Sequence, residues 1–406
     1  MVTAVFRPEP VVSAGLMEDI ATALSEKYEV IVIKPLPSRP QGFKIPEYNY
    51  EGLSYRVIEV ESYRCPESKF IGRYRETKSF GRAAARYIKE HHDEIDFIYN
   101  DCWWLWGVNM VAKKAVKYGI PYITPVQDVY PEAILNRLPT AILKKIAAVW
   151  LGRIDRYTLQ HASKVHTIGQ PLVDYLSRTR DIPKERFVLV RNWQDERRFT
   201  DYVEARENDT PKNSYFIFMF LGSVGKATGL ETVIKAFDNA RLSNAKLMIA
   251  GNGNYRDEYI RYAKSLGNEN VFFCDAPFDQ VPAIQSKADV LLLPLKKGIG
   301  KTSIPSKLPA YMFSSKPVLA SVDTDSDVAS CIREAQAGWI CEPECLESLT
   351  LCMKKVYQTS KEELVAMGKR GFDYSIQHFS KKVNLPIIVK ACEDVIERDK
   401  HRALGS

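Results

Sequence analysis

The sequence predicts an α/β fold in which two doubly wound domains follow one another along the chain. Strand-like and helix-like patterns alternate throughout, which is typical of parallel sheets covered by helices. The chain has 406 residues, more than one ordinary hydrophobic core contains. The alternation also starts afresh after 200–214, a polar stretch rich in charged and turn-forming residues, which is typical of a linker.

This stretch divides the chain into four parts. We expect an N-terminal Rossmann-like domain at 1–199, a linker at 200–214, a C-terminal Rossmann-like domain at 215–379, and a terminal helix at 380–406 that packs back toward the N-terminal domain. Open α/β sheets bind ligands at the carboxyl ends of their strands. We therefore expect the two domains to face a central cleft.

Each domain contains six strand candidates with helical patterns between them. The strands expected in the first half are 28–33, 55–60, 97–99, 121–125, 164–168 and 187–191, with helices at 15–27, 80–92, 108–118, 141–161 and 170–178. The strands expected in the second half are 216–221, 246–249, 271–273, 290–293, 317–322 and 338–340, with helices at 230–240, 255–266, 280–286, 306–313, 328–334 and 346–358.

The composition is that of a folded protein, with 45% apolar and 26% charged residues. No apolar run approaches the roughly 18 residues that a bilayer-spanning helix needs, and the first residues lack the features of a signal peptide. We expect a cytoplasmic protein. The eight cysteines are scattered without a CxxC pair, and even Cys341 and Cys345 lack further ligands nearby, which favours reduced thiols over a zinc site.

The net charge of +7 is concentrated in the first half, where Lys and Arg outnumber Asp and Glu at 64–90 and again at 137–191. The helical pattern at 138–161 places basic residues beside Trp150 and Tyr157, a combination that interfacial membrane helices use. An ordinary surface helix packed on its own domain explains the pattern equally well. Nucleic acid is not expected as a partner, because no recognised binding motif accompanies the charge.

The most informative stretch is 289–322. An apolar strand runs into a lysine-bearing loop, and a helix start follows, since Pro and Ser suit a first helical turn. A helix N-terminus offers free N–H groups and partial positive charge, so it suits a phosphate. We expect the diphosphate of a nucleotide-sugar to bind there, at Lys301, Thr302, Ser303, Pro305, Ser306 and Lys307.

Two glycine-bearing turns follow the first two strands of the second domain. Glycines let a backbone approach a ligand closely, and a lysine in such a turn reaches a phosphate oxygen. Turn geometry alone is the competing explanation for both. The residues that we expect to contact the donor here are Gly222, Ser223, Gly225, Lys226, Gly251, Asn252 and Gly253.

With these motifs in order, the chain resembles the family 4 glycosyltransferases of GT-B architecture, and within them the L-fucosamine-transferase-like subgroup of bacterial surface-polysaccharide biosynthesis. The motifs that carry the resemblance are FLGSVGKATGLETVIKAF, IAGNGN, ADVLLLPL, IPSKLPAYMFSSKPVLASVD, AGWICEP, VQDVYPEAI and RNWQDERRF. The resemblance implies a retaining transfer of a sugar, without metal or other cofactor, from a nucleotide donor on the C-terminal domain to an acceptor on the N-terminal domain.

One departure from that family concerns donor binding. Its members usually carry two glutamates eight residues apart, and these positions hold Thr302 and Ala310 here. The second glutamate is thought to hold the nucleotide ribose. Its loss removes a charged hydrogen bond worth about 1.5–3 kcal/mol, roughly ten- to a hundredfold in affinity.

Acceptor-side candidates lie in the first domain. Asp128, after Gln127 at a strand end, either orients an acceptor hydroxyl or caps a turn. Asp101 also ends a strand, and the neighbouring tryptophans either stack on a sugar or belong to the core. In the family, the loop that contains Glu9, Ser13 and Gly15 lies near the junction of donor and acceptor.

The expected reaction needs no carboxylate pair. We expect attack from the face on which the diphosphate departs, with Lys226 and Lys307 stabilising the leaving group and no metal required. The expected acceptor is a saccharide or a polyprenyl-diphosphate-linked saccharide, reached at the inner face of the cell membrane. The alternatives are a pseudoenzyme that binds without transfer, which the residues at 302 and 310 favour, and a nucleotide-sugar 2-epimerase.

Overall fold

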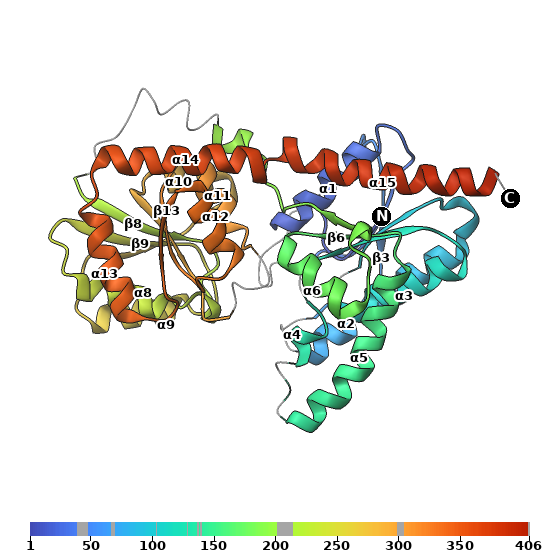
Figure 1. Cartoon of the computed structure of the whole chain (residues 1–406), viewed down its shortest axis with the longest axis horizontal. Helices are drawn as coiled ribbons and strands as arrows, with labels where there is room; N and C mark the ends of the chain where they lie inside the picture. The colour runs from blue at the N-terminus through green and yellow to red at the C-terminus, as the bar shows by residue number, and fades with distance from the viewer. Residues whose placement is uncertain are drawn as a thin grey trace. The chain divides into compact units, whose positions relative to one another are not determined.

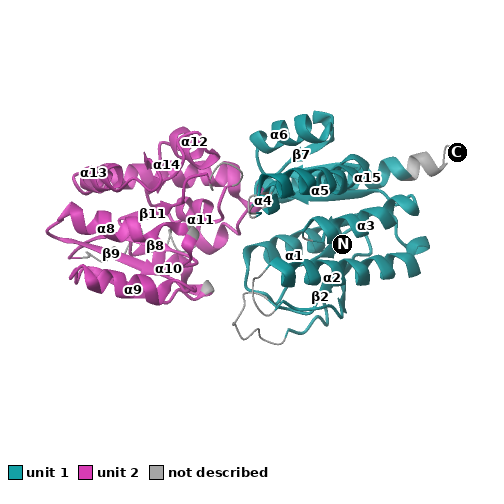
Figure 2. Ribbon diagram, turned by 90° about the horizontal axis from the view of Figure 1, so that it is seen from below, with its two compact units in different colours: residues 1–192, 384–406 teal, residues 193–383 magenta. Residues whose placement is uncertain are grey.

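The computed structural model describes residues 1–38, 48–65, 70–102, 104–127, 129–135, 138, 140–200, 214–298 and 304–404. The chain forms two compact units, Met1–Asn192 with Asn384–Ser406 (unit 1) and Trp193–Val383 (unit 2), coloured separately in Figure 2. Each unit is a parallel sheet covered by helices, so the predicted fold class of two Rossmann-like domains is confirmed.

The boundary between the units lies at 192/193, ahead of the predicted linker at 200–214. The segment that begins at Trp193 packs on unit 2, since Phe199 is buried and its ring lies 5.7 Å from that of Phe313. The backbone N–H of Gln194 also donates to the carbonyl of Phe379. Residues 201–213 of the predicted linker lie outside the described residues.

Unit 1 contains a seven-stranded parallel sheet in the order β3-β2-β1-β4-β5-β6-β7 (Figure 1). Its strands are β1 (Val2–Thr3), β2 (Ile31–Pro35), β3 (Arg56–Val60), β4 (Ile98–Asp101), β5 (Tyr122–Val126), β6 (Lys164–Thr167) and β7 (Phe187–Leu189). Its helices are α1 (Val12–Leu24), α2 (Phe70–Glu90), α3 (Leu105–Lys117), α4 (Glu132–Leu135), α5 (Ala141–His161), α6 (Gln170–Arg180) and, from Asn384 onward, α15 (Lys381–Leu404).

Two features of unit 1 differ from the prediction. Strand β1 was not predicted, because its two residues are too few to form a periodic pattern. Helix α2 begins ten residues before the predicted start at residue 80, since its first turns have no buried apolar side chain, and its buried apolar residues begin at Phe80 and Ala84.

Unit 2 contains a six-stranded parallel sheet in the order β10-β9-β8-β11-β12-β13, the order of a Rossmann fold. Its strands are β8 (Phe216–Leu221), β9 (Ala245–Ala250), β10 (Val271–Cys274), β11 (Val290–Pro294), β12 (Val318–Ser321) and β13 (Gly338–Cys341). Its helices are α8 (Leu230–Ala240), α9 (Arg256–Ser265), α10 (Val281–Ser286), α11 (Lys307–Phe313), α12 (Asp327–Ala335), α13 (Leu346–Tyr357) and α14 (Lys361–Phe379).

The core of unit 2 lies on both faces of its sheet. Along β8, Phe218 and Phe220 belong to the apolar cluster on one face, and Met219 and Leu221 belong to the cluster on the other. Successive strand residues point to opposite faces, so a strand covered on both sides reads as a continuous apolar run. This is why β8 and β11 were readily predicted from the sequence.

Helix α14 was not predicted, because Gly368 and Gly371 weaken its helical pattern. The structure explains both glycines. A Cβ on Gly368 would lie 2.2 Å from the carbonyl oxygen of Ser315, and one on Gly371 would lie 3.0 Å from the Cβ of Ala337. The two glycines therefore let α14 approach the body of unit 2 closely.

Candidate active site

Lys307, the first residue of α11, lies against the end of β8. A Cβ built on Gly222 would lie 2.3 Å from Cε of Lys307, and the Lys307 ammonium lies 4.2 Å from the centroid of the Phe220 ring. Burial lowers the pKa of Lys307 to about 8, and no charge among the described residues offsets that effect. An anion beside an ammonium of this kind would offset the cost of its burial.

Lys307 is held in place by the helix that carries it. The hydroxyl of Tyr311, one turn further along α11, donates to the carbonyl of Leu221 at 2.9 Å and accepts from its N–H at 3.0 Å. This pair of bonds joins α11 to the last residue of β8. Sequence reasoning missed Tyr311, although its spacing of four residues from Lys307 places both side chains on one face of the helix.

The two glycine turns pack against each other behind Lys307. Gly222 and Gly251 have φ angles of +146° and +127°, and a Cβ on Gly251 would lie 2.2 Å from the carbonyl oxygen of Gly222. A Cβ on Gly253 would lie 2.2 Å from the carbonyl oxygen of Val224. The three glycines are thus required by backbone packing alone.

The remaining donor-side candidates that the structure describes lie at or near the surface of unit 2. Ser223, Lys226, Asn252 and Ser306 are exposed, and Gly225 and Pro305 are half-buried. The carbonyl of Ser306 accepts a bond of 2.9 Å from the side chain of Gln194, a contact that sequence reasoning missed. Lys301, Thr302 and Ser303 lie outside the described residues.

Ala310, where related enzymes carry a glutamate, is buried within the apolar core beneath α11. It follows Lys307 by nearly one helical turn. Helix α11 therefore presents the Lys307 ammonium and the Tyr311 hydroxyl at the end of β8, and none of its residues carries a carboxylate.

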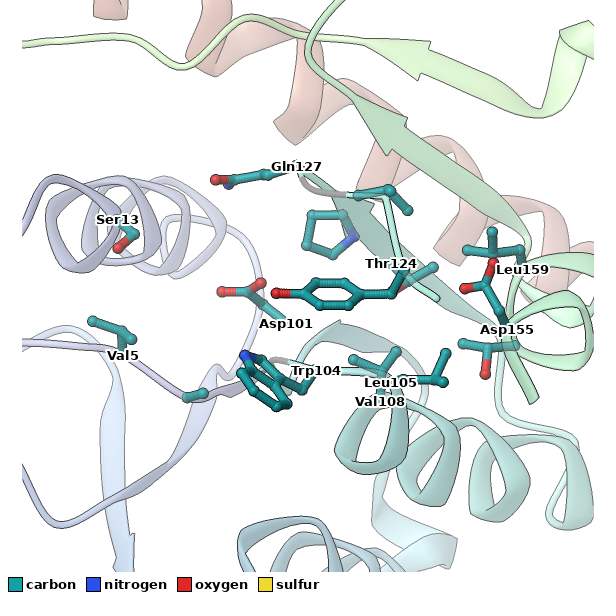
Figure 3. Close-up of a pocket in the computed structure, with 15 residues that line it drawn as sticks. Val5, Ser13, Asp101, Trp104, Leu105, Val108, Thr124, Gln127, Asp155 and Leu159 are labelled. Carbon is teal, nitrogen blue, oxygen red and sulfur yellow. The ribbon is translucent and has the colours of Figure 1, made fainter. Parts of the chain in front are cut away.

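Unit 1 contains a cavity of about 150 Å³ at the carboxyl ends of β1, β4 and β5 (Figure 3). The strand order reverses between β1 and β4, and such a reversal is where open α/β sheets bind ligands. The cavity is lined by Ala4, Val5, Ser13, Asp101, Trp104, Leu105, Val108, Thr124, Pro125, Val126, Gln127, Tyr130, Asp155, Thr158 and Leu159.

Asp101 supplies a carboxylate to this cavity from the end of β4 (Figure 3). It accepts a hydrogen bond of 3.2 Å from the hydroxyl of Thr3. Burial nevertheless raises the pKa of Asp101 to about 7. A carboxylate that titrates near neutrality is suited to accept or orient a hydroxyl proton. Trp104 lines the same cavity with a φ of +63°, a strained conformation for a tryptophan and one that often marks a functional site.

A buried ion network supports the cavity wall, and sequence reasoning missed it. Arg180 donates from Nε to Asp155 at 2.6 Å and from Nη2 to Glu132 at 2.8 Å. It also donates to the carbonyl of Tyr130 at 3.1 Å. Arg180 thereby links α5, α6 and the segment that carries Tyr130. No sequence spacing relates these residues, because they meet only in the folded domain.

The other acceptor-side candidates have different positions. Ser13 and Gln127 line the cavity, and the Gln127 side chain accepts a long bond of 3.5 Å from Asn192. Glu9 does not line it, since its buried carboxylate accepts from the backbone N–H of Ser38 at 2.8 Å. Gly15 lies on α1 with no atom near its would-be Cβ. Asp128 lies outside the described residues.

Within the described ranges, no group of three or more His, Cys, Asp or Glu side chains is arranged to hold a metal ion. Nor does any helix in that part of the chain combine the length and apolar character needed to cross a bilayer.

Comparison with known families decides the class of protein. Residues 16–198 match the family model described as Glycosyltransferase Family 4, and residues 202–374 match that of Glycosyl transferases group 1. The protein is a glycosyltransferase. The two matches divide the glycosyltransferase almost where its two units meet, so the predicted enzyme class is confirmed.

Two curated relatives are similar to this glycosyltransferase over most of its length. The putative colanic acid biosynthesis glycosyl transferase WcaI of Escherichia coli K12 is 24% identical over 365 residues, 84% of this chain and 87% of WcaI. The probable glycosyltransferase WbjE of Pseudomonas aeruginosa is 23% identical over 291 residues, 70% of each chain.

Solved structures share the fold of this glycosyltransferase. Anabaena Alr3699/HepE, crystallised with UDP, superposes with a TM-score of 0.70 at 13% identity, covering 97% of this chain and 99% of that one. WaaG, a glycosyltransferase involved in lipopolysaccharide biosynthesis, superposes with a TM-score of 0.68 at 15% identity, covering 97% and 98%. The fold is that of the GT-B glycosyltransferases.

Proposed function

We propose that this glycosyltransferase moves a sugar from a nucleoside diphosphate donor, bound by unit 2, to a saccharide or lipid-linked saccharide, bound by unit 1. The observation that carries the proposal is the uncompensated ammonium of Lys307 at the end of β8. The names of the relatives, which concern colanic acid and lipopolysaccharide biosynthesis, support a role in surface polysaccharide synthesis, and the motifs favour the L-fucosamine-transferase-like subgroup.

The donor half follows from the charge and packing around Lys307. A diphosphate at the end of β8 would supply the negative charge that the buried ammonium lacks, and it would raise the pKa of Lys307 toward its ordinary value. The backbone N–H groups of Gly222, Val224 and Gly251 already donate to carbonyls, so the two turns would shape the site and the lysines would supply its charge. Lys226 is exposed in the turn after β8 and would reach a second phosphate oxygen.

The reaction would proceed with retention and without a metal. The bond between the anomeric carbon and the diphosphate oxygen breaks as an acceptor oxygen attacks from the same face. The departing diphosphate oxygen takes the acceptor proton, and Lys307 and Lys226 stabilise the charge that develops on it. Asp101, in the unit 1 cavity, would orient the acceptor hydroxyl.

A second candidate function is donor or partner binding without transfer. Ala310 favours it, because a buried methyl group takes the position of a carboxylate that would hold the ribose. Lys307 argues against it, because an uncompensated buried ammonium costs stability and serves no evident structural purpose.

A thermal-shift panel with UDP, GDP, ADP, CMP and their sugar conjugates, with and without EDTA, tests the proposal. A ligand at about a hundred times its dissociation constant stabilises the protein by roughly 2.7 kcal/mol. We expect one nucleotide diphosphate to stabilise the protein in EDTA, and its sugar conjugate to release that nucleotide when an acceptor is added. Stabilisation without release would favour the binding protein, and no stabilisation by any member would contradict both functions.

A further inference from the structure

The first half of α5 presents an apolar face to the outside of unit 1. Ile142, Ile146 and Trp150 are 73%, 65% and 56% exposed, and their spacing of four residues places them along one side of the helix. Leu143 and Val149 extend the same side and are also exposed. Side chains this large and apolar are seldom gathered on a free surface, so the face marks an interaction site.

This apolar face points away from the domain. Leu151, which is buried, follows Ile142 by about two and a half helical turns and so lies on the opposite side of α5. The later buried residues, Asp155, Thr158 and Leu159, continue that inner side. Figure 1 shows the beginning of α5 extending beyond the sheet of unit 1.

The charged side chains of α5 beside the apolar face are positive. Lys145 and Arg156 flank the face, and Arg153 continues it toward the second half of the helix; all three are exposed. The one acidic side chain of α5, Asp155, is buried and paired with Arg180. Two copies of this face would bring like charges together, whereas an anionic surface with an apolar interior would satisfy both the basic and the apolar side chains.

Helix α2 adds to the apolar surface at the same end of unit 1. Phe70 and Ile71, in its first turn, are exposed. The Phe70 ring lies 6.4 Å from that of Trp106, which packs in the same apolar cluster as Leu151 of α5. The two helices therefore expose apolar side chains over one shared cluster.

We propose that this surface, made of the first half of α5 and the first turn of α2, docks unit 1 on an anionic lipid bilayer. The apolar side chains would enter the interface, and the lysines and arginines would contact the lipid phosphates. The second half of α5 lines the unit 1 cavity with Asp155, Thr158 and Leu159. Asp155 lies about 7–8 Å along the helix axis from Trp150.

Docking at this surface would bring the cavity within reach of an acceptor whose lipid tail stays in the bilayer. That use of the surface rests on the proposed function. The lipid binding itself does not, because it needs neither donor nor acceptor.

Vesicle co-sedimentation of the full-length protein tests the proposal. The vesicles are phosphatidylcholine alone or with roughly 30% phosphatidylglycerol. The test variant is Ile146→Ser/Trp150→Ser, and the matched control is Leu351→Ser/Val365→Ser, two side chains of unit 2 with exposures of 59% and 64%. We expect binding to anionic vesicles that falls at least tenfold in the test variant, is unchanged in the control and weakens with salt.

Three results would overturn the proposal. The first is a wild-type protein that does not bind anionic vesicles, and the second is a test variant that binds as the wild type does. The third is a wild-type dimer, measured by analytical ultracentrifugation, that Ile146→Ser/Trp150→Ser dissociates, since this would make a second copy the occupant. If the wild type bound anionic vesicles but neither bound a nucleotide nor transferred a sugar, only the proposed function would be contradicted.

Discussion

Replacing Lys307 with Met should stabilise the protein while it abolishes donor binding. Methionine keeps the length and apolar contacts of the lysine stem against Gly222 and Phe220 but removes the charge. The pKa of Lys307 falls from 10.5 to about 8 on burial. That pKa difference corresponds to a free-energy cost of about 3.4 kcal/mol for burying the charged amine. Screening by solvent at the partly exposed amine reduces this cost to about 1–3 kcal/mol.

The pH dependence identifies the cause. Below pH 8 the folded protein contains a charged, poorly solvated ammonium, so the wild type should be less stable than Lys307→Met by the full amount. Between pH 8 and 10.5 the folded chain has released a proton that the unfolded chain still holds, so the stability of the wild type rises with pH and the difference closes. Thermal unfolding at several pH values measures this difference in stability, since the unfolding temperature shifts by about 2–4 °C per kcal/mol for a domain of this size.

The same variant reports on binding. A nucleotide diphosphate that stabilises the wild type should give Lys307→Met no measurable shift, because the charge that meets the phosphates is gone. Equal or lower stability of Lys307→Met at pH 7 would refute the reasoning about burial. An undiminished nucleotide shift would refute the placement of the diphosphate.

Three further predictions concern the unit 1 cavity and the surroundings of Lys307. Asp101→Asn should lower turnover and remove an acid limb near pH 7 from the pH–rate profile, because the wild-type carboxylate is lost by protonation as the pH falls through about 7; an unchanged profile would exclude Asp101 from the reaction. Gly251→Ala should lower the free energy of unfolding in urea by about 1–3 kcal/mol from its backbone conformation alone. Gly225→Ala, which has open space around it, should change that free energy little, and equal effects would contradict the packing of the two turns. Ala310→Glu should lower the free energy of unfolding in urea, because the carboxylate would enter the apolar core beneath α11, and a bound nucleotide diphosphate should recover part of that loss; no recovery would show that the ribose lies elsewhere.

The sequence predicted most of the elements around Lys307 because each of them has a local cause. Apolar runs covered on both faces reveal β8 and β11, and glycines mark the turns after β8 and β9. The sequence pattern did not distinguish glycines that let a ligand approach from glycines that backbone packing requires. Gly222 and Gly251 pack against each other and against Lys307, so backbone contact alone accounts for them.

The acceptor side was harder to predict because its residues meet through the fold. Asp101 was recognisable as a polar residue at a strand end, but its partner Thr3 belongs to a strand of two residues. Arg180, Asp155 and Glu132 lie on three different helices and have no common spacing. Glu9, an acceptor-side candidate from family likeness, accepts from the backbone N–H of Ser38 after β2, a contact that no sequence spacing indicates.

Isothermal titration in EDTA of the wild type and Lys307→Met, with the nucleotide diphosphate that gives the largest thermal shift, bears most directly on the Lys307 site. We expect one site in the wild type, no binding in the variant, and proton uptake on binding above pH 8 as the diphosphate restores the charge of Lys307. Binding that is equal in both proteins, or that appears only when a divalent metal replaces the EDTA, would contradict this expectation.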